Sequence, residues 1–154
     1  MRQKTQKLLL EQTDKKLKNY SSLSNLSVPD MGWLRLIRKS LNVSLTQLAS
    51  KLNISPQSVR AIEERERAGS LTIKSLRSAA EALNLKFIYV LLPKEKSLQA
   101  MINKRALELA REIVLRTSHT MKLEDQGVSK ERIEKAIMAK AEELKNEMPK
   151  LLWD

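Results

Sequence analysis

Apolar residues recur at helical spacing on both sides of a short break in residues 44–65, SLTQLASKLNISPQSVRAIEER. The repeat before the break predicts one helix with a single buried stripe. Asn53 and Ile54 interrupt that repeat. Ser55 can cap a second helix, and Pro56 stands at its first position, where a missing N–H costs nothing. The apolar positions are Leu45, Leu48, Ala49 and Leu52 before the break and Val59 and Ile62 after it.

The second of these helices has a polar and basic outward face. The residues that this spacing leaves off the core are Gln57, Ser58, Arg60, Ala61 and Arg65. Short polar and basic side chains on a helix suit the base edges in a major groove. The pattern therefore predicts a helix-turn-helix that binds DNA.

The same periodicity extends the helix-turn-helix into a compact unit from Gly32 to about Pro93. A first helix has the apolar positions Trp33, Leu34, Ile37 and Leu41. Residues 65–70, with Gly69, form a loop, and Thr72 caps a fourth helix. The inward positions of the fourth helix are Ile73, Leu76, Ala79, Ala80 and Leu83.

Residues 86–92, KFIYVLL, change to a strand-like pattern of β-branched and aromatic residues closed by a proline. A lone strand needs a partner for its backbone donors and acceptors. The simplest partner is the same strand of a second copy, which predicts a homodimer. The N-terminal arm is the alternative partner. The residues of this dimer strand are Phe87, Ile88, Tyr89 and Val90.

Two helical extensions flank this unit. Residues 2–19 predict a basic helix whose apolar positions are Leu8, Leu9, Leu10 and Leu17, and residues 21–29 predict a linker. After Ser97, one long helix covers residues 98–125 and ends near Gly127, a C-cap glycine. A last helix begins at Ser129, with Glu131 in its first turn, and fades at Pro149. The expected domains are 1–31, 32–96 and 97–154.

Composition narrows the class of protein. The 154 residues contain no cysteine and one histidine, His119, so thiolate chemistry and multi-histidine metal sites are excluded. No residue set combines a nucleophile, a general base and a pocket, so we expect a protein that is not an enzyme and has no cofactor. No apolar run is long enough for a membrane span, and the start lacks a signal-peptide core. We therefore expect a cytoplasmic protein without membrane contact.

Charge is unevenly distributed along the chain, whose formal net charge is +11. Residues 1–96 hold 18 Lys or Arg against 8 Asp or Glu, whereas residues 97–154 hold 11 against 10. The positive excess coincides with the helix-turn-helix and its N-terminal arm, as a footprint for DNA phosphates would. Solubility alone is the other explanation of a basic surface.

The helix-turn-helix sequence resembles the Cro/repressor type, the Xre-like family. Further segments extend the likeness over nearly the full length: KLLLEQ with DKKL, GWLRLIRKSL, KFIYVLLPK, RTSHTMKLEDQ and the terminal LLWD. Together they resemble the family called mobile mystery protein A, which is associated with mobile elements and a neighbouring Fic-domain partner. The resemblance implies a mainly α fold: a Cro/repressor-like domain with one dimerising strand and helical extensions. It also implies an antitoxin that inhibits a Fic toxin and represses its own operon.

The resemblance also assigns DNA contacts. The candidates for base contacts are Gln57, Ser58 and Arg60. The candidates for phosphate contacts, which position a protein without specifying sequence, are Thr46, Gln47, Lys51, Arg65, Arg67 and Lys74. Two positions depart from the family: Leu45 replaces a glutamine that touches phosphate, and Asn53 replaces the turn glycine. The alternative for the arginines is a solvated face on which Glu63, Glu64 and Glu66 cancel their charge.

In the long tail helix, one face carries Ile102, Ala106, Leu109, Ile113, Thr117, Thr120 and Glu124. The stretch from Thr120 to Glu124 resembles the inhibitory motif of Fic systems, in which a glutamate pairs with an arginine of the Fic active site. A bidentate Arg–Glu pair can compete there with the ATP γ-phosphate. Asp125 departs from the Gly or Asn of that motif. The alternative function is a stand-alone Xre-type regulator whose tail only dimerises.

Overall fold

The computed structural model describes residues 2–123 and 129–154, and the side chains of residues 3–119 and 129–154. The chain divides into two compact units, each described here by itself. Asn25–Val90 form the central unit, and Met1–Ser24 with Leu91–Asp154 form the hairpin unit. The described residues are helical and contain no strand.

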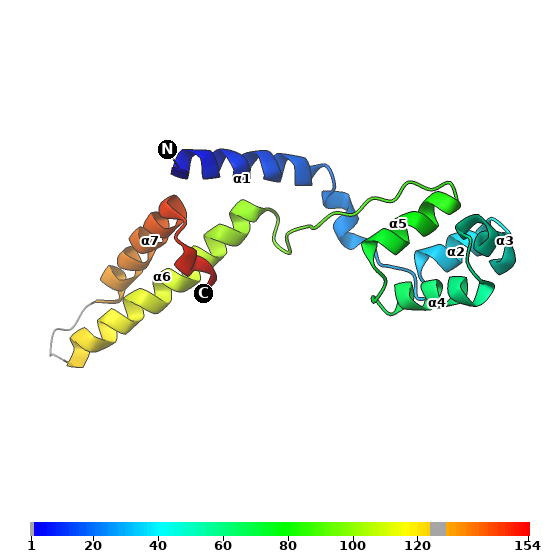
Figure 1. Ribbon diagram of the computed structural model, residues 1–154. Helices are drawn as coiled ribbons and strands as arrows, with labels where there is room; N and C mark the ends of the chain where they lie inside the picture. Colours follow the sequence, from blue (N-terminus) through cyan, green and yellow to red (C-terminus); the bar gives the residue numbers. More distant parts are fainter. Residues whose placement is uncertain (1, 124–128) are drawn as a thin grey trace. The chain divides into compact units, whose positions relative to one another are not determined.

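Four helices make the central unit: α2 (Trp33–Ser40), α3 (Leu45–Leu52), α4 (Pro56–Arg67) and α5 (Ile73–Ala82) (Figure 1). Each predicted cap is confirmed. The hydroxyls of Ser55 and Thr72 accept from the backbone N–H groups of Ser58 and Ser75, both at 3.1 Å. Ser44 forms a reciprocal capping box with Gln47. These local bonds explain where α3, α4 and α5 begin.

The core of the central unit is aliphatic. α3 packs against α4 and α5, and α2 packs against α4. The buried apolar side chains are Leu34, Leu48, Ala49, Val59, Ala79 and Leu83. Three predicted core positions are wrong, because Trp33, Leu41 and Ile73 are exposed. The side chain that α2 buries in addition to Leu34 is a charged one, Arg38.

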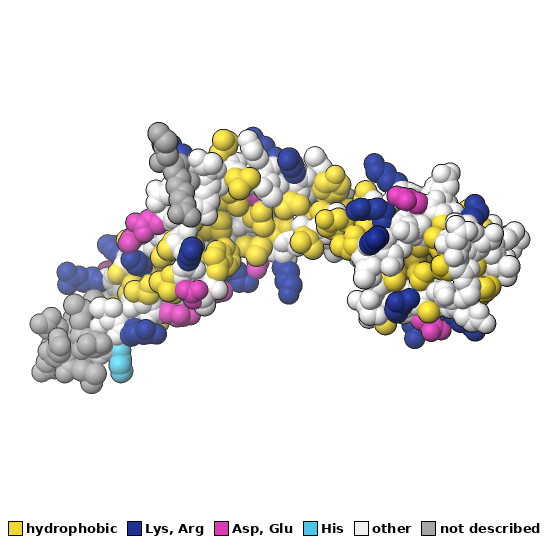
Figure 2. Space-filling model, in the orientation of Figure 1, with side chains coloured by type: hydrophobic (Ala, Val, Ile, Leu, Met, Phe, Trp, Pro, Cys, Tyr) yellow, Lys and Arg dark blue, Asp and Glu magenta, His cyan; other side chains and the backbone are white. Residues whose placement is uncertain are grey.

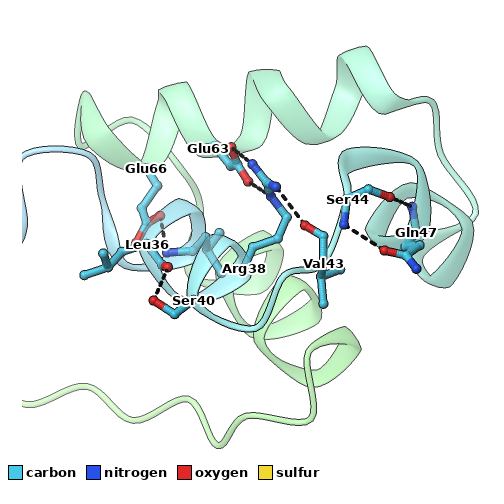
Figure 3. A network of polar contacts seen from close by, with 9 residues as sticks. Leu36, Arg38, Ser40, Val43, Ser44, Gln47, Glu63 and Glu66 are labelled. Carbon is cyan, nitrogen blue, oxygen red and sulfur yellow. Dashed lines mark hydrogen bonds and ion pairs between the residues drawn. The ribbon is translucent and has the colours of Figure 1, made fainter.

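Arg38 forms a buried ion pair with Glu63 of α4 (Figure 3). Its Nε donates to Glu63 Oε1, and its Nη2 donates to Oε2 at 3.1 Å. Its Nη1 donates to the carbonyl of Val43 at 2.9 Å. Both carboxylate oxygens and three guanidinium donors are thus satisfied, which burial of these charges requires. The pair ties α2, the α2–α3 turn and α4 together.

One turn further along α4, Glu66 caps the first turn of α2. Its two carboxylate oxygens accept from the backbone N–H groups of Trp33 at 3.0 Å and Leu34 at 2.9 Å. A negative charge at a helix N-terminus is favourable, and unpaired N–H groups there need acceptors. Gly32 makes this approach possible: its φ is +80°, and a Cβ would lie 2.8 Å from Glu66 Oε2.

The predicted dimer strand over residues 86–92 is wrong. Phe87, Ile88, Tyr89 and Val90 lie in a segment without strand pairing. The sequence has strand propensity there, but no other described segment supplies a ladder of donors and acceptors, and propensity alone does not make a sheet. The rings of Phe87 and Tyr89 stack instead, with centroids 6.2 Å apart.

The hairpin unit consists of α1 (Arg2–Lys18), α6 (Leu98–Leu123), α7 (Lys130–Glu147) and two short 3-10 helices, η1 (Ser21–Asn25) and η2 (Lys150–Trp153). η1 occupies part of the segment predicted as a linker. Ser129 caps α7 as predicted, and Gly127 lies outside the described residues. α7 runs back along α6 (Figure 1). Their shared core is Ala106, Leu109, Ala110, Ile137, Ala141, Leu144 and Leu152.

Polar contacts contribute to the attachment of α1 to this hairpin. Asp14 accepts from the backbone N–H groups of Leu98 at 2.8 Å and Gln99 at 3.0 Å, so it caps α6 from outside that helix. Two apolar positions predicted for α1, Leu8 and Leu9, are more than half exposed. The other two, Leu10 and Leu17, are half-buried, so the leucine pattern is wrong for Leu8 and Leu9 only.

We predict that Glu63→Gln destabilises the central unit by about 3–5 kcal/mol, because it removes one partner of a buried charge pair. Urea unfolding measures this in a Trp153→Phe background, in which Trp33 is the one remaining tryptophan and reports on the central unit. Glu64→Gln is the matched control, because Glu64 is the exposed neighbour. Equal midpoints for the two variants would contradict the structural role of the pair.

Gly32→Ala and Gly69→Ala are a second matched pair of substitutions. Both glycines have positive φ, +80° and +72°, so an alanine at either position adds at least about 1–2 kcal/mol of backbone strain, and the ψ of 157° at Gly32 adds to its share because that region is essentially restricted to glycine. At Gly69 a Cβ meets nothing within 4 Å, whereas at Gly32 it meets the Glu66 carboxylate. We therefore expect Gly32→Ala to cost at least about 1 kcal/mol more, as for a lost hydrogen bond. Equal losses in urea unfolding would refute the contact.

Candidate nucleic-acid interface

The outward face of α4 begins with the residues predicted to contact bases. Gln57 and Arg60 are exposed and Ser58 is half-buried. The buried Val59, at 1% exposure, sets the rotation of the helix and so turns positions 57 and 60 outward. The Ser58 hydroxyl lies 2.8 Å from that of Ser55, so it takes part in the cap of α4. Gln57 and Arg60 are the freer of the three side chains.

The start of α3 presents a second set of polar groups. Gln47 uses its Oε1 to accept from the backbone N–H of Ser44 at 2.8 Å, which leaves its amide donors facing away from the cap (Figure 3). The capping box thereby orients the side-chain amide N–H groups of Gln47, which are donors that can bind a phosphate oxygen. Thr46 and Lys51, the other phosphate candidates of α3, are exposed.

The cations of α4 are not neutralised in the way that the solvated-face alternative requires. Of its three acidic residues, Glu63 binds Arg38 and Glu66 caps α2, so only Glu64 is exposed. Arg60, Arg65 and Arg67 are exposed and form no ion pair with the described residues. Arg65 is oriented by its own helix, since its Nε donates to the carbonyl of Ala61 at 3.3 Å. The outer face of α4 is therefore basic.

Further exposed cations lie on the neighbouring helices of the central unit. Lys74 on α5 was a predicted phosphate contact and is exposed. Lys39 on α2 and Arg77 on α5 are exposed as well, although the helix-turn-helix motif does not single them out. Their positions off the apolar stripes of their helices are the signal that identifies them.

The helix-turn-helix pattern also did not predict that two glutamates of α4 face the core, although their spacing in the sequence indicates it. Glu63 and Glu66 follow Val59 by four and seven residues, which places all three on one face of the helix. A carboxylate on an apolar face needs a donor partner, and Arg38 on α2 is the side chain that supplies it.

The structure explains how the two departures from the family motif, Leu45 and Asn53, are accommodated. Leu45 packs against the apolar core of the central unit rather than pointing to solvent. Asn53 ends α3 in the left-handed region, with φ 54° and ψ 42°, a conformation that Asn adopts more readily than most residues. The turn between α3 and α4 is therefore made without glycine.

The apolar stripe of the long tail helix is covered within the chain itself. Ile102, Ala106 and Leu109 are buried, and Ala106 and Leu109 lie in the core that α6 shares with α7. Further along, Thr117 is exposed and its hydroxyl donates to the carbonyl of Ile113 at 3.0 Å. The predicted inhibitory pair lies outside the described residues: Glu124 entirely, and Thr120 as regards its side chain. His119 is exposed.

The predicted dimer segment is solvent-facing in part. Ile88 and Tyr89 are each 65% exposed, and Phe87 and Val90 are half-buried.

None of the described helices is both long and apolar enough to cross a membrane. No group of three or more metal-ligating side chains comes together among the described residues.

One comparison with known proteins identifies the central unit. A protein-family model, HTH_3, described as Helix-turn-helix, matches residues 34–90. The matched range begins in α2, contains α3 with its Asn53 turn and α4, and continues through α5. Searches of curated proteins and of solved structures gave no match. Residues 34–90 are thus an Xre-type helix-turn-helix domain, the DNA-binding part of this chain.

Proposed function

We propose that this protein is a transcriptional repressor that recognises an operator with α4, and that it is the antitoxin of a Fic-domain toxin. The observation that carries the first half is the inward turn of Glu63 and Glu66. It leaves Arg60, Arg65 and Arg67 as a basic outer face on the second helix of the motif. Such a face attracts phosphates and brings Gln57 to the base edges. The proposed site of action is the cytoplasm.

Base and phosphate contacts divide by position in this proposal. Gln57 and Arg60 contact base edges, and Ser58 supports them at the capped end of α4. The phosphate contacts come from exposed groups around them: Thr46, Gln47, Lys51, Arg65, Arg67 and Lys74. The former set specifies sequence and the latter fixes the orientation of the protein on the duplex.

A homodimer belongs to the same proposal. Two copies related by a two-fold axis match a palindromic operator whose half-sites lie about one helical turn apart. The exposed apolar side chains of Ile88 and Tyr89 support a contact between copies, because exposed apolar surface marks interaction sites. Side-chain packing, without strand pairing, makes this contact.

We predict that Gln57→Ala and Arg60→Ala each weaken operator binding by about 1–3 kcal/mol, the value of a specific base contact. Quantitative footprinting on the chain's own promoter measures the loss, and the wild type should protect two half-sites. Gln99→Ala and Arg111→Ala are the matched controls, since both residues are exposed on α6. Unchanged footprints of the α4 variants, or equal losses in the controls, would refute the assignment.

The antitoxin half of the proposal is supported by the resemblance of the full chain to mobile mystery protein A. It is also supported by the charge balance of residues 97–154, which differs from the basic N-terminal part. In this proposal Thr120 and Glu124 act in inhibition, with Glu124 pairing with an arginine of the toxin's nucleotide site. The competing function is a stand-alone regulator whose tail serves dimerisation.

Co-expression with a neighbouring Fic-domain gene separates these two functions. We expect Glu124→Ala to restore nucleotide transfer by the toxin without abolishing the complex, because the pair with the toxin arginine is lost. Growth and co-purification are the two readouts, and Asp125→Ala is the neighbouring control. A fully silent complex with Glu124→Ala would move inhibition elsewhere in the tail. Absence of co-purification with the wild-type chain would favour the stand-alone regulator.

A further inference from the structure

The hairpin unit contains an open cavity of about 540 Å³ beside the C-terminal half of α1. Its walls come from three segments: the C-terminal part of α1, η1, and the residues that lead into α6. The lining residues are Asp14, Lys15, Leu17, Lys18, Ser21, Ser24, Leu92, Pro93, Glu95, Lys96 and Ser97. This volume falls within the range of about 300–1,000 Å³ that small-molecule sites occupy. Figure 2 shows apolar side chains gathered between α1 and the start of α6.

The floor of this cavity is apolar. Leu17, Leu92 and Pro93 contribute hydrophobic surface. The serines offer few free donors, because the hydroxyls of Ser21 and Ser24 already donate to the backbone carbonyls of Lys18 and Ser21, both at 2.8 Å. Polar recognition in the cavity therefore depends on its charged groups.

Both carboxylates in the wall are already engaged. Asp14 caps α6 through two backbone N–H groups. Glu95 binds Lys104 Nζ at 2.6 Å, and this hydrogen bond and the carboxylate charge raise the pKa of Lys104. Neither acid forms an ion pair with a lysine of the cavity.

Three lysines remain around the apolar floor: Lys15, Lys18 and Lys96. All three are exposed, and none forms an ion pair with the described part of the chain. Three lysines from two segments of the chain thus line the same cavity as the apolar side chains. This arrangement suits a ligand with an apolar body and an anionic head, since burial of the body and charge attraction act together.

We infer that this cavity is a binding site for a small amphipathic anion, a molecule with an apolar chain and a carboxylate or phosphate head. The chain lies on Leu17, Leu92 and Pro93, and the head lies between the lysines. This site is separate from the DNA-binding face of α4, and its occupancy is measurable without DNA or toxin.

Calorimetric titration of the full chain tests the site with four probes: octanoate, octyl phosphate, inorganic phosphate and octyltrimethylammonium. We expect saturable one-to-one binding of octanoate, octyl phosphate or both, and the preference between them identifies the head group. Inorganic phosphate lacks the chain and the cation has the wrong charge, so both should bind at least ten-fold more weakly. Affinity for the anions should fall as salt is added.

The chain offers a matched pair of double variants. K15E/K96E reverses two lysines of the cavity, whereas K16E/K94E reverses their neighbours, which do not line it. Both change the net charge equally on the same helix and the same segment. We expect at least a ten-fold loss of anion affinity for K15E/K96E and less than a two-fold change for K16E/K94E. The neutral K15Q/K96Q provides a milder test if charge reversal disturbs folding.

Three results would overturn the inference. The first is no saturable binding of either octyl anion to the wild type. The second is equal loss in the two double variants, which would mean general attraction to a basic protein. The third is equal affinity for the octyl cation, which would mean an apolar contact without charge recognition.

Discussion

The buried pair between Arg38 and Glu63 is the interaction on which the DNA-binding domain depends. Two opposite charges are removed from water at the point where α2, the α2–α3 turn and α4 meet, and only full pairing makes this tolerable. The pair lies on the inward face of α4 that the buried Val59 also marks, and Glu66 follows on the same face as the cap of α2. This orientation of α4 directs Gln57 and Arg60 outward. The buried pair and the apolar stripe of α4 thus agree on which side chains α4 presents to solvent.

The features of this fold that are predictable from sequence are those made between residues close together in the chain. Ser55, Thr72 and Ser129 each cap a helix as expected, because a cap involves a side chain and an N–H three residues away. The partners of Arg38 and Asp14 lie 25 and 84 residues away. No helical period relates such residues, so the sequence pattern left them among ordinary surface charges. The strand prediction for residues 86–92 was wrong for the opposite reason. Their local strand propensity is strong, but no other described segment of the chain pairs with them.

The candidate DNA site was more predictable than the tail. The buried stripe of α4 alone predicts that positions 57 and 60 face outward. The structure adds that the nearby arginines are exposed and form no ion pair with the described residues. In the tail, the periodicity located the inward face of α6 but could not identify what covers it. The cover is α7 of the same chain. An amphipathic helix in a sequence therefore predicts a buried face without indicating whether the partner is internal or another protein.

The chain enters the central unit after Ser24 and leaves it after Val90, so the hairpin unit is assembled from two separated pieces. This order has a consequence during synthesis, when the N-terminal part emerges first and domains fold as units. All residues of the central unit leave the ribosome before Leu98 and Gln99, the groups that Asp14 caps. The nascent protein thus passes through a stage with a complete DNA-binding domain and an α1 that waits for its partner. Folding of the hairpin unit then follows that of the central unit.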